Sequence, residues 1–133
     1  MKLKKVLLIA LMAIIVLCII LFFILNSFMH TNLSELNGSG KLEESYISPN
    51  GKYRADLFLI NKGGATVAYQ QRVSITSLED KRNKFEDDTI YWVYPSVENT
   101  SVKWKNSDDI VINGITISIE NPDTYYNYKE DDH

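Results

Sequence analysis

The pattern of apolar and polar residues changes completely along the chain. Residues Val6 to Leu25 form an unbroken apolar run, whereas apolar and polar residues alternate with a period of two from Lys41 onward. An apolar run of about 20 residues is long enough to cross the hydrocarbon core of a membrane as an α-helix. A period of two is typical of β-strands that bury one face. The sequence therefore predicts one transmembrane helix at residues 6–25, followed by a β-rich domain.

Two other interpretations of the apolar run are weaker. A buried core helix would need more surrounding chain than the strand-like remainder provides. A cleaved signal peptide carries a shorter apolar stretch, of about 7–15 residues, and then a small-x-small cleavage site. No good site of that kind follows Leu25, and Leu17 stands before Cys18 where a lipoprotein signal needs a small residue. We therefore expect an uncleaved signal-anchor, with a cleaved signal peptide as the alternative.

The distribution of charge predicts the orientation of this anchor. Lys2, Lys4 and Lys5 precede the apolar run without any acidic residue among them. The positive-inside rule then places residues 1–5 in the cytoplasm and the C-terminal domain outside the cell membrane. All 17 acidic residues follow the run, together with 11 of the 14 basic ones, so the remainder carries a net charge of −6. A domain of this charge has no electrostatic reason to bind nucleic acid.

The chain beyond the helix divides into three further segments. Residues 26–40 end in Gly-Ser-Gly and are predicted to be a juxtamembrane spacer, flexible at its glycine-rich end. Residues 41–127 form the extracytoplasmic β-domain, and residues 128–133 form an acidic tail. Within the β-domain, Pro49-Asn50-Gly51 and Asn113-Gly114 are strong turn signals. The strands predicted between the turns cover residues 42–47, 52–60, 67–76, 89–97, 101–105, 110–112 and 115–119.

These strands predict a mainly β fold. Six or seven short antiparallel strands follow one another as a small meander, which closes as a sandwich or a partial barrel. No stretch with helical periodicity and useful length follows residue 40. The side chains expected in the core are Tyr53, Leu57, Tyr69, Trp92, Trp104, Ile112 and Ile117.

Residues suited to catalysis or metal binding are scarce. The two histidines, His30 and His133, lie in the spacer and at the terminus, and Cys18 lies in the apolar run. Histidine-based or cysteine-based catalysis within the β-domain is therefore not expected. The acidic pairs do not have the spacing of a calcium loop. We predict a non-enzymatic protein with no cofactor and no metal site. The alternative is a hydrolase that uses carboxylates such as those of Asp56, Asp87 or Asp108.

Aromatic residues in the last third of the chain are candidates for a binding surface. Aromatic side chains are enriched at protein interfaces. The candidates are Tyr91, Tyr94, Tyr125 and Tyr126. The alternative is that these side chains complete a small hydrophobic core.

Several motifs in the β-domain occur together in an order that resembles a known family. They are SPNGKYRA at 48–55, GGAT at 63–66, IYW at 90–92, and VKW at 102–104 leading to IVING at 110–114. This order, across residues 45–127, resembles a family of small single-pass membrane proteins of unknown function from bacillus-type Gram-positive bacteria. The resemblance implies a membrane anchor and an envelope setting. It implies no activity and no catalytic residue.

These observations favour a binding or interaction module of the cell envelope. The expected partners are the lipid bilayer, through the helix, and an envelope protein or a cell-wall component, through the β-domain. An assembly or immunity factor that acts on a neighbouring membrane protein is a further alternative.

Overall fold

The computed structural model describes residues 1–64, 67–79 and 84–131 and divides the chain into two units, Met1–Thr31 and Asn32–His133. Ala65 and Thr66 of the GGAT motif lie outside the described residues, as do residues 80–83. The last two residues of the predicted acidic tail, including His133, also lie outside them.

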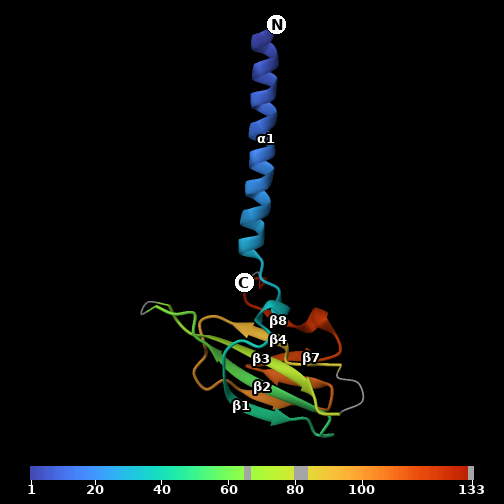
Figure 1. Cartoon of the computed structure of the whole chain (residues 1–133). Helices are drawn as coiled ribbons and strands as arrows, with labels where there is room; N and C mark the ends of the chain where they lie inside the picture. Colours follow the sequence, from blue (N-terminus) through green and yellow to red (C-terminus); the bar gives the residue numbers. More distant parts are fainter. Residues whose placement is uncertain (65–66, 80–83, 132–133) are drawn as a thin grey trace. The chain divides into compact units, whose positions relative to one another are not determined.

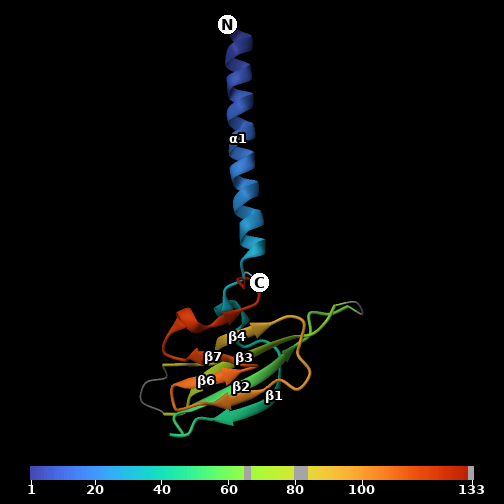
Figure 2. The same ribbon diagram turned by 180° about the vertical axis from the view of Figure 1, so that it is seen from behind.

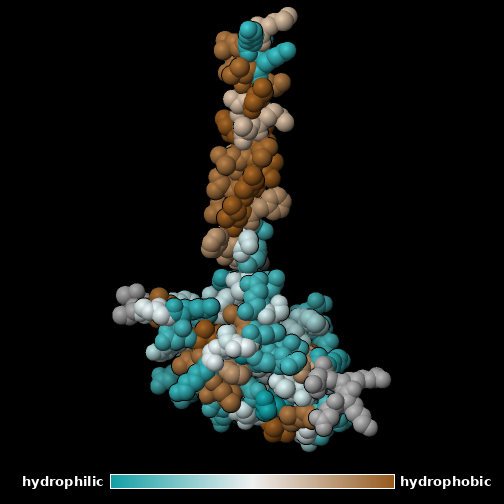
Figure 3. Space-filling model, in the orientation of Figure 1, coloured by the Kyte–Doolittle hydropathy of each residue, from teal (hydrophilic) through white to brown (hydrophobic). Residues whose placement is uncertain are grey.

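The first unit contains one long helix, α1 (Lys2–Met29), shown in blue in Figure 1. None of its residues is buried, and apolar side chains cover most of the face of the helix that is visible in Figure 3. The helix is long and apolar enough to cross a membrane, as predicted. It extends beyond residues 6–25 at both ends, because nothing in the flanking lysines or in Asn26 and Ser27 interrupts helical hydrogen bonding.

The second unit is a β-domain with two sheets (Figures 1 and 2). In the five-stranded sheet the order is β1-β2-β3-β4-β8, and in the three-stranded sheet it is β5-β6-β7. All neighbouring strands are antiparallel except β4 and β8, which are parallel. The strands are β1 (Lys41–Ile47), β2 (Tyr53–Ile60), β3 (Gln70–Ser77), β4 (Asp88–Val93), β5 (Val102–Trp104), β6 (Asp109–Ile112), β7 (Ile115–Ser118) and β8 (Tyr126–Asn127).

The predicted fold class is therefore confirmed, with one strand more than expected in the described part of the chain. Strand β8 has only two residues and follows a short 3-10 helix, η2 (Pro122–Thr124). Two residues are too few to produce a recognisable alternation of apolar and polar positions. Strand β4 also ends earlier than predicted, at Val93. Pro95 follows soon after and has no N–H to donate to a neighbouring strand.

Both predicted turns form hairpins. Between β6 and β7, Asn113 (φ 48°) and Gly114 (φ 83°) both have positive φ, as a two-residue type I′ turn requires. Between β1 and β2, the Gly51 N–H donates to the Ser48 carbonyl (2.9 Å) and the Ser48 N–H donates to the Tyr53 carbonyl (2.8 Å). These turns set the registers that align the apolar positions of each pair on one face.

The main core receives side chains from both sheets. Its buried members include Ala55 and Leu57 of β2, Val73 and Ile75 of β3, and several isoleucines of β6 and β7. Among the predicted core residues, Leu57, Trp92, Ile112 and Ile117 are buried, whereas Tyr53 and Trp104 are partly buried against the core. Tyr69 is a wrong prediction, since 48% of its surface is exposed. It lies one residue before β3, so the alternation of inward-facing and outward-facing side chains in that strand does not include it.

The opposite face of the five-stranded sheet carries a second, smaller core. Leu36, in the 3-10 helix η1 (Leu33–Leu36), is only 4% exposed and packs with Ile60 and Trp92. The β-domain therefore begins at Asn32, ahead of the predicted boundary at Lys41. Residues 32–40 lie on the sheet because Leu36 gains apolar burial there.

Candidate functional site

The four tyrosines proposed as a binding surface do not lie together on one surface. Tyr91 is only 2% exposed, and its ring stacks on that of Tyr126 with centroids 5.1 Å apart. Tyr125 donates its hydroxyl hydrogen to the Ile119 carbonyl at 2.6 Å. Tyr94 is 38% exposed and packs instead against Tyr128, with ring centroids 5.7 Å apart. Tyr91, Tyr125 and Tyr126 thus belong to the main core or pack against it, and only Tyr94 is exposed.

The candidate catalytic carboxylates each have a separate structural environment. The buried carboxylate of Asp56 accepts hydrogen bonds from Arg54 Nε at 2.9 Å and from Ser45 Oγ at 2.6 Å. Asp87 pairs with Arg72, and Asp108 is exposed in the turn before β6. The structure therefore gives two of these three carboxylates an arginine partner.

Arg72 is the most deeply buried charged residue in the described part of the chain. Its guanidinium is 0% exposed and lies 4.0 Å from the centroid of the Phe58 ring. Nε donates to the Ser39 carbonyl at 2.7 Å, and the two terminal nitrogens donate to the two carboxylate oxygens of Asp87 at 3.0 and 2.9 Å. Nη1 also lies 3.1 Å from Thr89 Oγ1. These bonds join residues 32–40 to β3 and to the start of β4.

Asp87 is held in its ionised form by the same contacts. Burial raises the pKa of Asp87, but several hydrogen bonds, among them those donated by Arg72 and by the Gly38 N–H, and the positive charge of Arg72 lower it more, so the pKa lies below its ordinary value of 3.8. Asp87 also has positive φ (53°), which a short polar residue tolerates better than most. The charged pair therefore holds the residue before β4 against β3.

The depressed pKa of Asp87 predicts acid sensitivity of the β-domain. The folded state favours the ionised carboxylate, so the unfolded chain binds more protons as the pH falls through 3.8. The stabilisation is present above this pH and is lost as the pH falls through the lower pKa of the folded state. Asp87→Asn should lower the free energy of unfolding near neutral pH. In acid, the free energy of unfolding of this variant should decrease less steeply with falling pH than that of the unmodified protein. Unfolding followed by tryptophan fluorescence between pH 2 and 7 measures both effects, and an unchanged acid slope in Asp87→Asn would contradict the assignment.

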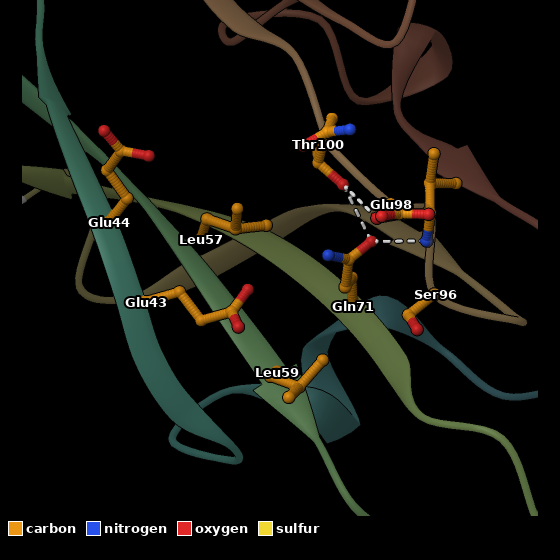
Figure 4. Close-up of a pocket in the computed structure, with 10 residues that line it drawn as sticks. Glu43, Glu44, Leu57, Leu59, Gln71, Ser96, Glu98 and Thr100 are labelled. Carbon is orange, nitrogen blue, oxygen red and sulfur yellow. Dashed lines mark hydrogen bonds between the residues drawn. The ribbon is translucent and has the colours of Figure 1, made fainter.

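A groove of about 560 Å³ lies on the face of β1, β2 and β3 that carries the main core residues (Figure 4). Leu57 and Leu59 of β2 form its apolar floor, and Glu43 and Glu44 of β1 line one side. The other side is the loop of residues 96–100. Clefts that bind ligands are typically about 300–1,000 Å³ and combine an apolar lining with a few polar groups. The groove has this size and this mixture of side chains.

The loop wall is held by a buried glutamine of β3. Gln71 Oε1 accepts a hydrogen bond from the Val97 N–H at 2.8 Å and lies 2.9 Å from the Thr100 hydroxyl oxygen (Figure 4). The Ser96 N–H donates to the Tyr69 carbonyl at 2.7 Å, and Asn99 adopts positive φ (58°). The loop is therefore ordered before any ligand binds, which lowers the entropic cost of binding.

The ionisable residues that line the groove are Glu43, Glu44 and Glu98, all of them acidic. The Tyr46 hydroxyl donates to Glu44 Oε2 at 2.8 Å. Burial, the hydrogen bond to Glu44 and the negative charges of Glu44 and Glu43 raise the pKa of Tyr46 to about 12. The local potential is thus negative. Across the described residues, no three or more His, Cys, Asp or Glu side chains are grouped to hold a metal ion.

Sequence reasoning missed this groove. Glu43 and Glu44 lie in adjacent positions of a strand, where a regular strand would send their side chains to opposite faces. A β-bulge between Leu42 and Glu44 disrupts that alternation. No sequence pattern identifies the bulge. The position of the loop of residues 96–100 depends on hydrogen bonds to Gln71, which is distant in sequence.

A family of unknown function (DUF5412) matches the chain over residues 2–131. The chain belongs to this family. The matched residues include both α1 and most of the β-domain. Neither a curated protein sequence nor a solved structure matches the chain.

Proposed function

We propose that this protein is a single-pass, membrane-anchored binding module that displays its β-domain on the outer side of the cell membrane. One observation carries the proposal: residues 6–25 of α1 are all apolar and none of them is buried, so their side chains favour a lipid environment. Lys2, Lys4 and Lys5 favour a cytoplasmic N-terminus. The motif resemblance favours the envelope of a bacillus-type Gram-positive bacterium.

The groove of the β-domain supports a binding role. It is preformed, has an apolar floor and is lined by charged groups of one sign. The partner is an envelope protein or a cell-wall component. The enzymatic alternative needs two carboxylates facing one substrate, and pairing with arginine leaves Asp56 and Asp87 poorly suited to that role.

Site-specific photocrosslinking in intact cells tests the binding role. A photoreactive amino acid replaces Val97, which is exposed and lines the groove, or Thr116, an exposed residue of β7 that serves as the control. A crosslinked adduct formed from position 97 but not from position 116 is the expected result. Equal adducts from both positions, or none from position 97, would contradict binding at the groove.

A further inference from the structure

We propose that the groove binds an extended, basic polypeptide segment of a partner protein, with apolar side chains on Leu57 and Leu59 and lysine or arginine side chains at Glu43, Glu44 and Glu98. This inference rests on the proposed binding function and adds the chemistry of the partner to it.

The spacing of the floor residues favours an extended ligand. Leu57 and Leu59 are two positions apart on β2, so both side chains point to the same face of the strand. Consecutive strand residues advance about 3.3 Å, which separates these side chains by about 6.6 Å. Alternate side chains of an extended peptide have the same separation. Such a peptide can therefore place two successive apolar side chains on the two leucines.

The charges around the groove favour a basic ligand. Glu43 and Glu44 lie on β1 and Glu98 lies on the opposite loop, so negative charge flanks the apolar floor on both sides (Figure 4). All three glutamates are exposed. None of them forms an ion pair within the described residues. Complementary charge speeds encounter and selects partners by sign.

The position of β1 at the edge of its sheet gives the ligand access. β1 pairs with β2 on one side, and at its other edge the Trp104 indole N–H caps the Tyr46 carbonyl at 3.0 Å. Glu43 and Glu44 lie closer to the start of β1 than Tyr46, whose carbonyl accepts this hydrogen bond. No described strand pairs with this edge, so an extended chain can enter the groove across the start of β1.

Peptide binding to the full chain tests the inference directly. The protein is placed in nanodiscs of zwitterionic phosphatidylcholine, which do not attract basic peptides by charge. The probe is a fluorescein-labelled Lys-Val-Lys-Val-Lys-Val-Lys peptide, followed by anisotropy. Probes of the same length with Glu in place of Lys, or Ser in place of Val, separate the roles of charge and apolar contact.

Two triple variants of equal net charge distinguish an effect of the charges in the groove from an effect of the net charge of the whole domain. The combination Glu43→Gln, Glu44→Gln and Glu98→Gln removes the charges of the groove. The control combination Glu79→Gln, Glu86→Gln and Glu130→Gln removes three exposed carboxylates elsewhere in the domain.

We expect the Lys-Val probe to bind, with its Kd raised at least tenfold by the groove triple and changed less than twofold by the control triple. We also expect at least tenfold weaker binding of both the Glu-Val and the Lys-Ser probes. Equal loss in both triples, equal affinity for Lys-Val and Lys-Ser, or no binding would overturn the inference. Specific crosslinking at position 97 without this charge dependence would leave the binding function standing and refute the basic segment alone.

Discussion

Replacing Arg72 with leucine is expected to lower the free energy of unfolding of the β-domain by about 3–5 kcal/mol. The substitution removes a fully buried guanidinium and leaves the Asp87 carboxylate without its two charge-assisted hydrogen bonds. It also removes the bond to the Ser39 carbonyl, which attaches residues 32–40 to the sheet. Chemical denaturation of the full chain in micelles, followed by tryptophan fluorescence, measures the change.

Both tryptophans of the chain, Trp92 and Trp104, lie in the β-domain, so the signal reports this unit alone. The control is Lys84→Met, which breaks an exposed ion pair with Glu120. Exposed pairs contribute little, and we expect almost no change in the control. A loss below about 1 kcal/mol for Arg72→Leu would mean that the buried pair does not hold residues 32–40 in place.

Replacing Gly40 with alanine should lower the free energy of unfolding by about 2–4 kcal/mol, the sum of backbone strain and overpacking. Gly40 has φ +92°, a conformation that alanine rarely adopts. A β-carbon there would lie 2.9 Å from the Leu59 carbonyl oxygen and 3.1 Å from side-chain atoms of Phe58 and Ile60. The nearest of these atoms belongs to the backbone, which cannot move aside without disturbing β2.

The matched control for Gly40→Ala is Gly51→Ala. Gly51 also has positive φ (+71°), but no heavy atom lies within 4 Å of the position that a β-carbon would take there. It should therefore show only the conformational part of the loss, about 1 kcal/mol. Denaturation followed by tryptophan fluorescence compares the two variants. Equal losses would show that Gly40 does not approach β2 closely and that residues near it are not packed on the sheet.

The features that could be predicted from the sequence are local in origin. The apolar run that forms α1, the Asn113-Gly114 turn and the alternation of β2 each depend on residues close together in the chain. Their physical causes, namely burial of apolar surface and the φ preference of turn residues, act over a few positions. The turn and β2 therefore appear in the structure close to their predicted bounds, and α1 contains the whole of the predicted span.

The features that could not be predicted depend on long-range contacts. Gln70, Arg72 and Ser74 are polar residues of β3, and all three are buried in the structure. Burial of Arg72 requires Ser39 and Asp87, which lie far away in sequence and show no recognisable pattern. The apparent spacer is likewise part of the domain because of Leu36, a single apolar residue that no periodicity identifies.

The candidate site shows the same limit. Aromatic enrichment suggested a surface, but it could not distinguish Tyr91, which completes the core, from Tyr94, which remains exposed. The groove combines β1, β2 and a loop beyond β4, and only tertiary structure brings Glu43 and Glu98 to the same cavity. Gln71 alternates in the same register as the apolar Val73 and Ile75, but no sequence pattern shows that its amide would hold the loop.

Cysteine labelling in intact cells tests the central claim, a single membrane span with the β-domain outside. In a Cys18→Ser background, Asn50→Cys places the sole cysteine in an exposed turn of the β-domain, and Lys4→Cys places it before the apolar run. A membrane-impermeant maleimide should label the cysteine at position 50 in intact cells and the one at position 4 only after the membrane is opened. Labelling of position 4 in intact cells with position 50 protected would contradict the proposed orientation, and recovery of the protein in the soluble fraction would contradict the anchor.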